Sequence, residues 1–210
     1  MYVCGVLLFF RYQLNMRVAI IKSAGNILSV VYGLQRIGID AEITSDTDKI
    51  RTADKVIFPG VGQACATMAY LHEHHLDEVI VGLKQPVLGI CIGLQIMCAH
   101  SEEGNVDCLG IFDEEVKRFN HSDFKIPQIG WNTIQHDGNP LFSGLTQNDY
   151  VYYVHSYYVG TGKNTIATTN YIHSYSAALQ KNNFYAVQFH PEKSGTVGEK
   201  ILQNFIEHIH

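Results

Sequence analysis

Short apolar runs alternate with amphipathic helical stripes through the first half of this chain. Runs typical of strands occupy residues 18–21, 41–44, 55–58 and 86–90, and stripes typical of helices lie at 27–37, 64–80 and 92–100. Apolar strands that alternate with helices in this order build a parallel sheet covered by helices on both faces. We therefore predict an α/β fold with a largely parallel sheet.

The second half of the chain shows a different pattern of predicted secondary structure. Short β-prone runs separated by polar and glycine-bearing turns predict strands at residues 115–119, 129–134, 150–159, 165–169, 177–179 and 184–189. A last amphipathic stripe ends the chain at 201–209. We expect these strands to extend the same sheet in an antiparallel or mixed manner.

The length of 210 residues fits one domain, which we assign to residues 16–210. Residues 1–15 fit this pattern poorly because Met16 and Arg17 directly precede the first good strand. We interpret 1–15 as an N-terminal extension, either an upstream start or a disordered arm. The alternative is an added edge strand.

Composition excludes several classes of protein. The net charge of −5 lacks the basic excess expected of a nucleic-acid binder. No apolar run approaches the roughly 18 residues of a membrane helix. The five cysteines are odd in number and form no CxxC pair, and we see no signal peptide, which favours a reducing, cytoplasmic setting. One of these thiols is therefore a candidate nucleophile.

The segment Gly89-Ile90-Cys91-Ile92-Gly93 lies between an apolar strand and a helix. A nucleophile flanked by small residues at this junction is typical of a nucleophile elbow, where neighbouring backbone comes too close for a Cβ. The helix N-terminus favours a thiolate, and the N–H of Ile92 is placed to hold an oxyanion. The alternative is a buried core cysteine beside two structural glycines.

The run His190-Pro191-Glu192 supplies the groups that such a thiol needs. A thiol nucleophile requires a base, and the base requires an orienting group. In extended backbone, His190 and Glu192 would project from one face, where the carboxylate could fix the imidazole tautomer. On its own this pair could equally be a solvated histidine and a surface glutamate.

Taken together, these motifs resemble those of the class I (triad) glutamine amidotransferases, which have a flavodoxin-like α/β fold. The matching segments are GICIGLQ at 89–95 and QFHPEKSG at 188–195. Further segments resemble the glutaminase subunits of imidazole glycerol phosphate synthase, a subfamily of histidine biosynthesis. These are PGVG at 59–62, KIPQIGWN at 125–132 and VHSYY at 154–158.

The resemblance implies a role for each matching residue. Cys91 would be the nucleophile, His190 the base and acid, and Glu192 the group that orients the histidine. The positions expected to bind substrate or the oxyanion are Gly60, Val61, Ile92 and Gln95. The positions expected to meet a synthase subunit are Asn26, Trp131 and Lys193.

The activity implied by the resemblance is hydrolysis of L-glutamine to glutamate and ammonia through a cysteine thioester. Ammonia would pass to a cyclase (synthase) subunit in a heterodimer that forms imidazole glycerol phosphate and AICAR. No cofactor or metal is expected. His72, His74 and His75 could suggest a metal site, but their spacing does not put all three on one helix face, which favours a solvated helix end. His155 is expected to pack and to form a hydrogen bond rather than to catalyse.

The first loop departs from the pattern of the family, because Lys22-Ser23-Ala24-Gly25-Asn26 stands where an Asp-Tyr-Gly-x-Gly-Asn sequence is usual. This departure keeps a paralogous glutaminase open, one that feeds a different synthase such as a sugar-amidating enzyme. Two further hypotheses are a related Cys-His peptidase and a catalytically silent binding protein on the same fold.

Overall fold

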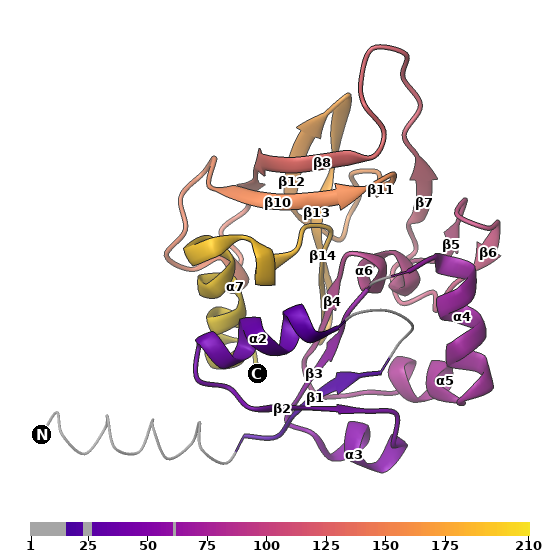
Figure 1. Ribbon diagram of the computed structural model, residues 1–210, viewed down its shortest axis with the longest axis vertical. Coiled ribbons are helices and arrows are strands. Elements are labelled where there is room, and N and C mark those ends of the chain that lie inside the picture. Colours follow the sequence, from indigo (N-terminus) through magenta and orange to yellow (C-terminus); the bar gives the residue numbers. More distant parts are fainter. Residues whose placement is uncertain (1–15, 23–26, 61) are drawn as a thin grey trace, which may run out of the picture.

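The computed structural model describes residues 16–22, 27–60 and 62–210. Its main sheet has eight strands, and the expected parallel core is confirmed (Figure 1). The five strands of that core, in spatial order, are β2 (Ala41–Thr44), β1 (Val18–Ile21), β3 (Lys55–Phe58), β4 (Val87–Ile90) and β14 (Phe184–Val187). Three antiparallel strands follow: β13 (His173–Lys181), β12 (Thr165–Tyr171) and β9 (Gln135–His136).

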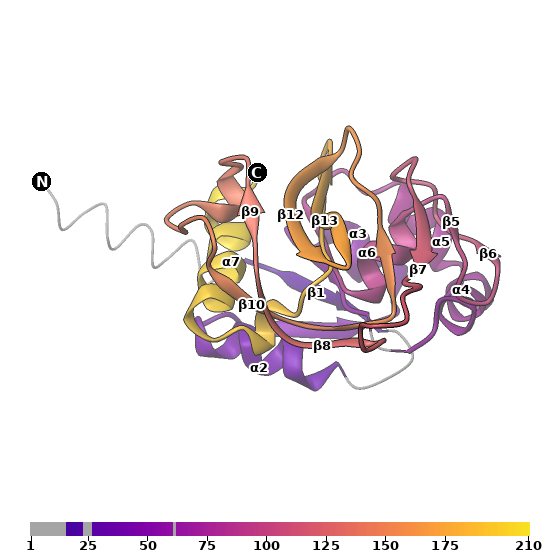
Figure 2. The ribbon, with the colours of Figure 1, turned by 90° about the horizontal axis from the view of Figure 1, so that it is seen from above.

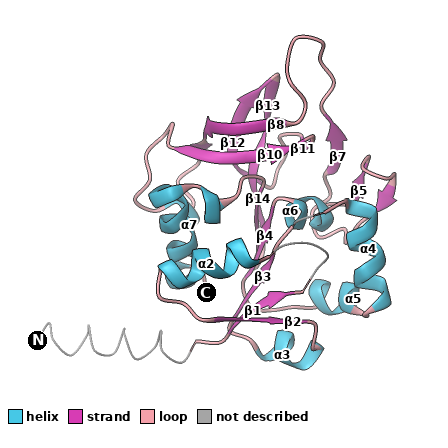
Figure 3. Cartoon of the chain, in the orientation of Figure 1, coloured by secondary structure: helices cyan, strands magenta, loops and turns pink. Residues whose placement is uncertain are grey.

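Helices cover both faces of the parallel strands, as the alternating pattern predicts (Figure 3). One layer consists of α2 (Leu28–Arg36) and α7 (Gly195–His208), which pack on side chains such as Ile20 and Ile57. The other layer consists of α4 (Ala64–Glu73), α5 (Leu76–Val81) and α6 (Ile92–Met97), which pack on Ile21 and Phe58. Neighbouring residues of one strand therefore point to opposite faces of the sheet and belong to two separate hydrophobic cores. The remaining helix, α3 (Thr47–Thr52), lies near β1.

Several strands of the second half leave the main sheet, so the expectation of one extended sheet is wrong for them. The strands β8 (Gln128–Thr133) and β10 (Tyr150–His155) form an antiparallel pair of their own. A third sheet contains β11 (Tyr157–Val159), β7 (Glu115–Arg118), β5 (His100–Ser101) and β6 (Val106–Asp107). The apolar run 150–159 belongs to two sheets because the chain changes partner at Ser156. Figure 2 shows the β8–β10 pair running along one side of the molecule, the side on which α2 lies.

Two helix boundaries also differ from the prediction. The stripe at 64–80 is two helices, α4 and α5, because His75 takes a left-handed conformation with φ of 54°. The helix predicted at 92–100 ends at Met97, and His100, predicted to be helical, is the first residue of β5. Two short 3₁₀ helices, η1 (Pro140–Phe142) and η2 (Pro191–Lys193), complete the described chain.

The predicted extension at 1–15 lies outside the described residues. Within the part of the chain that the structure describes, no helix has the length and apolar character needed to cross a bilayer.

Candidate active site

Cys91 lies at a strained turn where β4 passes into α6. Its φ of 54° and ψ of −106° fall outside the regions that L-residues favour. The flanking glycines make this turn possible. A Cβ on Gly93 would lie 2.1 Å from the carbonyl oxygen of Phe58, and one on Gly89 would lie 2.9 Å from the carbonyl carbon of Gly93. The backbone itself therefore requires glycine at both positions.

The loop after β3 packs directly against this turn. A Cβ on Gly60 would lie 2.3 Å from the backbone nitrogens of Ile92 and Gly93. Gly60 and Ile92, both predicted near the oxyanion position, are thus brought together. Val61, predicted with them, lies outside the described residues.

His190 and Glu192 lie together in the segment between β14 and α7. His190 Nδ1 is 2.9 Å from Glu192 Oε1, and both side chains are buried. His190 is extended, as expected, but Glu192 lies in η2, so a tight turn rather than a strand brings the pair together. An ionised carboxylate can only accept, so Nδ1 carries the hydrogen and Nε2 is left as a base.

Helix α2 supports the turn that carries Glu192. A Cβ on Gly33 would lie 2.9 Å from Glu192 Cβ, so this helix approaches η2 as closely as glycine permits. Arg36 Nη2 donates to the backbone oxygen of Glu192 at 2.9 Å, and Ser29 Oγ donates to Glu192 Oε1 at 3.4 Å. A remote element thereby holds the carboxylate in place.

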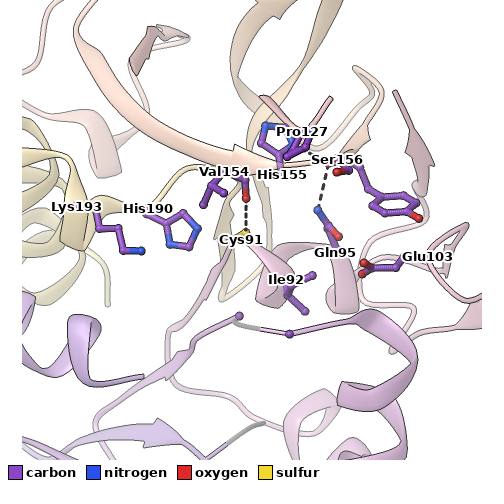
Figure 4. Close-up of a pocket in the computed structure, with 13 residues that line it drawn as sticks. Cys91, Ile92, Gln95, Glu103, Pro127, Val154, His155, Ser156, His190 and Lys193 are labelled. Carbon is purple, nitrogen blue, oxygen red and sulfur yellow. Dashed lines mark hydrogen bonds between the residues drawn. The ribbon is translucent and has the colours of Figure 1, made fainter. Parts of the chain in front are cut away.

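The electrostatic setting of His190 favours its protonated form. Burial alone would lower its pKa, but the neighbouring Cys91 sulfur in its thiolate form and the Glu192 carboxylate more than offset burial and raise the pKa to about 10. Nε2 has no hydrogen-bond partner among the described residues. Figure 4 shows the imidazole facing the side of the pocket where Cys91 lies. The arrangement suits a thiolate–imidazolium pair.

The backbone of β10 holds the histidine segment. His190 N–H donates to Tyr152 O at 2.9 Å, and Tyr152 N–H donates to Ser194 Oγ at 2.9 Å. Ser194 Oγ in turn donates to His190 O at 2.6 Å. Three hydrogen bonds therefore close a ring between the strand and the segment.

A pocket of about 340 Å³ opens above Cys91. His190 and Lys193 lie on one side of Cys91 in Figure 4, and Gln95 and Glu103 lie on the other. The pocket thus has a nucleophile and a base at one end and polar acceptors at the other. A small extended polar molecule fits these features.

Two buried glutamines lie at the pocket, and one of them, Gln95, lines it. Gln95, expected to contact substrate, donates through Nε2 to Gln188 Oε1 at 3.1 Å and to Tyr157 O at 3.2 Å. Gln188 Nε2 lies 3.7 Å from Cys91 Sγ. Gln188 was not predicted as a site residue. Its place two residues before His190 is the one signal that could have identified it.

His155 lines the pocket, but its surroundings keep it neutral. Burial lowers its pKa to about 4, while its Nδ1 donates to Tyr157 O at 2.7 Å and its Nε2 lies 3.2 Å from the Tyr175 hydroxyl. Both ring nitrogens are occupied, so this histidine is not available as a base. The expectation of packing and hydrogen bonding is confirmed.

The residues expected at a partner surface lie on the outside of the molecule. Trp131 is 55% exposed and stacks edge-on against Tyr152, at 6.0 Å between ring centroids. Ile129 on the same strand is 63% exposed. Lys193 is exposed at the edge of the pocket. Asn26 lies outside the described residues.

Side chains that could hold a metal do not gather in the described ranges. No group of three or more histidine, cysteine, aspartate or glutamate side chains there is placed to hold an ion. His72 instead contacts Asp77 Oδ2 at 2.8 Å on the surface.

Comparison with known proteins identifies the class to which this fold and site belong. Residues 19–209 match the glutamine amidotransferase class-I family, and the chain belongs to that family. A glutamine amidotransferase of known crystal structure has the same fold, with a TM-score of 0.71 at 16% identity over 90% of this chain and 97% of that one. Another, from Thermotoga maritima, has a TM-score of 0.60 at 17% identity over 91% of this chain and 83% of that one.

Relatives of known name narrow the class further. A protein of Bacteroides fragilis (strain YCH46) named imidazole glycerol phosphate synthase subunit HisH is 58% identical over 91% of this chain and 100% of that relative. A protein of the same name from Haemophilus influenzae (strain Rd) is 48% identical over 88% of this chain and 93% of that relative.

Proposed function

We propose that Cys91, His190 and Glu192 form the catalytic triad with which this chain hydrolyses L-glutamine. The chain is a glutamine amidotransferase, the glutaminase subunit of imidazole glycerol phosphate synthase in histidine biosynthesis. One observation carries the assignment of residues. His190 is held by Glu192 through Nδ1, its Nε2 has no partner in the described part of the chain, and the residue lines the same pocket as Cys91.

The proposed reaction begins with transfer of the Cys91 thiol proton to His190 Nε2. The thiolate attacks the side-chain amide carbon of glutamine and forms a tetrahedral oxyanion. His190 then gives its proton to the amide nitrogen, the C–N bond breaks, and ammonia leaves a glutamyl thioester. Water, deprotonated by His190, attacks the thioester to release glutamate and restore the thiol.

The proposed oxyanion site uses the backbone around Gly60 and Ile92. The N–H of Ile92 lies at the start of α6, directly after the nucleophile, and its nitrogen lies close to Gly60 in the loop that follows β3. Val61 follows Gly60 in the sequence and is proposed to contribute with it. Backbone donors at such a site stabilise the charge that develops on the carbonyl oxygen.

The far end of the pocket is proposed to bind the α-ammonium group of glutamine. Glu103 and Gln95 both line that end, and they offer carboxylate and amide oxygens as acceptors. Glu103 is held in place because its Oε2 accepts from the N–H of Ala64 at 2.9 Å. Binding of the ammonium there would leave the side-chain amide at Cys91.

The proposed partner is the cyclase subunit, which would bind over the β8–β10 pair and Lys193 and form a heterodimer. Support comes from the exposed apolar residues of this pair, since aromatic side chains commonly dominate binding energy at interfaces. These residues include Ile129, Trp131 and Tyr150. Ammonia would pass directly to that subunit, because ammonia released into water at pH 7 is mostly protonated and loses its nucleophilicity.

Replacement of the nucleophile tests the proposed triad. In the complex, Cys91→Ala should abolish glutamate release from glutamine but leave synthesis from added ammonia. Cys65→Ala is the matched control, since Cys65 is exposed and does not line the pocket. It should retain both activities. Glutaminase activity that survives in Cys91→Ala would refute the assignment of the nucleophile.

A further inference from the structure

Gln188 connects the nucleophile to the substrate-binding glutamine. It is fully buried directly after β14, where its Nε2 lies 3.7 Å from Cys91 Sγ. Its Oε1 accepts from Gln95 Nε2 at 3.1 Å. A single side chain therefore contacts both Cys91 and Gln95.

The backbone of Tyr157 sets the direction of this chain of hydrogen bonds. Its carbonyl oxygen can only accept, so Gln95 must turn its NH₂ group toward it, at 3.2 Å. Gln188 must then turn its oxygen toward that NH₂ group, because two NH₂ groups would otherwise face each other. With its oxygen directed at Gln95, Gln188 directs its own NH₂ group at the sulfur of Cys91.

The same chain of bonds determines what Gln95 presents to the pocket. Its NH₂ group is bound by Tyr157 and Gln188, and its Oε1 has no partner among the described residues although it is buried. Gln95 lines the pocket beside Glu103, as Figure 4 shows. An orphaned acceptor costs free energy until a donor reaches it, so this position is suited to an N–H group of a ligand.

We propose that Gln188 is a positioning residue with two effects on glutamine hydrolysis. It holds Gln95 with its carbonyl oxygen directed to the ammonium group of glutamine, and it donates a hydrogen bond to the Cys91 sulfur that favours the thiolate. This inference rests on the proposed function of Cys91. It adds a residue that acts through its neighbours without contacting substrate.

Gln188→Met tests both effects, because methionine has a similar shape and forms neither hydrogen bond. In the complex, KM for glutamine should rise about tenfold, the effect of losing one well-placed polar interaction. The pH midpoint of Cys91 alkylation by iodoacetamide should rise by about one unit, which lowers alkylation about tenfold below the midpoint.

Gln188→Glu separates the two effects. Its carboxylate still accepts from Gln95, so KM should stay within about twofold of the wild-type value. The ionised carboxylate has no hydrogen for the sulfur and repels a thiolate, so the alkylation midpoint should rise at least as far as in Gln188→Met. A KM that rises as much as in Gln188→Met would refute the orientation of Gln95 by Gln188.

Asn204→Leu is the control for a merely structural role. Asn204 is another fully buried amide. It donates to Leu141 O and Ser143 O, and none of these residues lines the pocket. This variant should lose stability but keep KM and the alkylation midpoint. If Gln188→Met also keeps both values, the inference is overturned while an inactive Cys91→Ala still supports the triad. If Cys91→Ala is active, the proposed function itself fails.

Discussion

The two sides of the candidate active site are held by different physical means. On the cysteine side, backbone packs on backbone, with Gly60, Gly89 and Gly93 at the points of contact. On the histidine side, close contacts of Gly33 and Gly198 are joined by side-chain hydrogen bonds that hold the segment through Glu192 and Ser194. The glycine contacts around Cys91 should therefore tolerate almost no change, whereas the side-chain hydrogen bonds of the histidine side can be lost singly with the protein still folded.

The cysteine side should show the largest effect. Gly93→Ala would place a Cβ 2.1 Å from the oxygen of Phe58, a contact that only movement of β3 or α6 can relieve. We expect a loss of more than about 3 kcal/mol in the free energy of unfolding, measured by urea titration. Gly160→Ala is the control, since a Cβ there meets nothing within 4 Å. Equal stability of the two variants would contradict close backbone packing.

Ser194→Ala tests the histidine side and should have a smaller effect. It removes the buried hydroxyl that accepts from Tyr152 N–H and donates to His190 O. We expect a loss of about 1–3 kcal/mol in the free energy of unfolding. Glutaminase activity should fall, with the protein still folded. An effect as large as that of Gly93→Ala would remove the difference between the two sides.

Glu192→Gln tests the electrostatic part of the histidine side through pH. The pKa of His190 is raised in the folded state, so its protonation stabilises the protein fully below pH 6.5 and the contribution is lost as pH rises toward about 10. Without the Glu192 charge, this pKa should fall and the decline in stability across that window should become smaller.

The matched control for this pH test is Glu199→Gln, since Glu199 pairs with Arg36 on the neighbouring helix. Unfolding free energies of the three proteins should be compared between pH 6 and 10. An unchanged pH dependence in Glu192→Gln would contradict the role of its carboxylate in stabilising the imidazolium.

Lys55 connects the start of β3 with the end of the chain segment that follows α7. Its replacement should have the smallest effect on stability. It begins β3, and its Nζ donates to Ile209 O just after α7. Burial lowers its pKa to about 8, so the unfolded chain binds the extra proton between pH 8 and 10.5 and this group makes stability rise with pH there. Lys55→Met should remove that rise and change stability at pH 7 by less than about 1.5 kcal/mol. A difference between variant and wild type that does not vary with pH would contradict the shift.

Local features were predictable where one segment contains all the necessary information. The strands β1, β2 and β3 occupy the predicted residues because each is a short apolar or alternating run with a clear stop. The turn at Cys91 was predictable because its glycines lie within the same pentapeptide. The His190–Glu192 contact was expected too, although the turn that makes it was not.

Features that depend on several segments were not predictable in this way. The sequence alone determined the strand–helix alternation, the turn around Cys91 and the presence of a base with its carboxylate. Only the tertiary structure decided that β8 and β10 leave the main sheet and that Gln188 lies between Cys91 and Gln95. The reason is physical. Periodicity and turn chemistry act over a few residues, whereas the orientation of a buried amide is set by acceptors that distant strands supply.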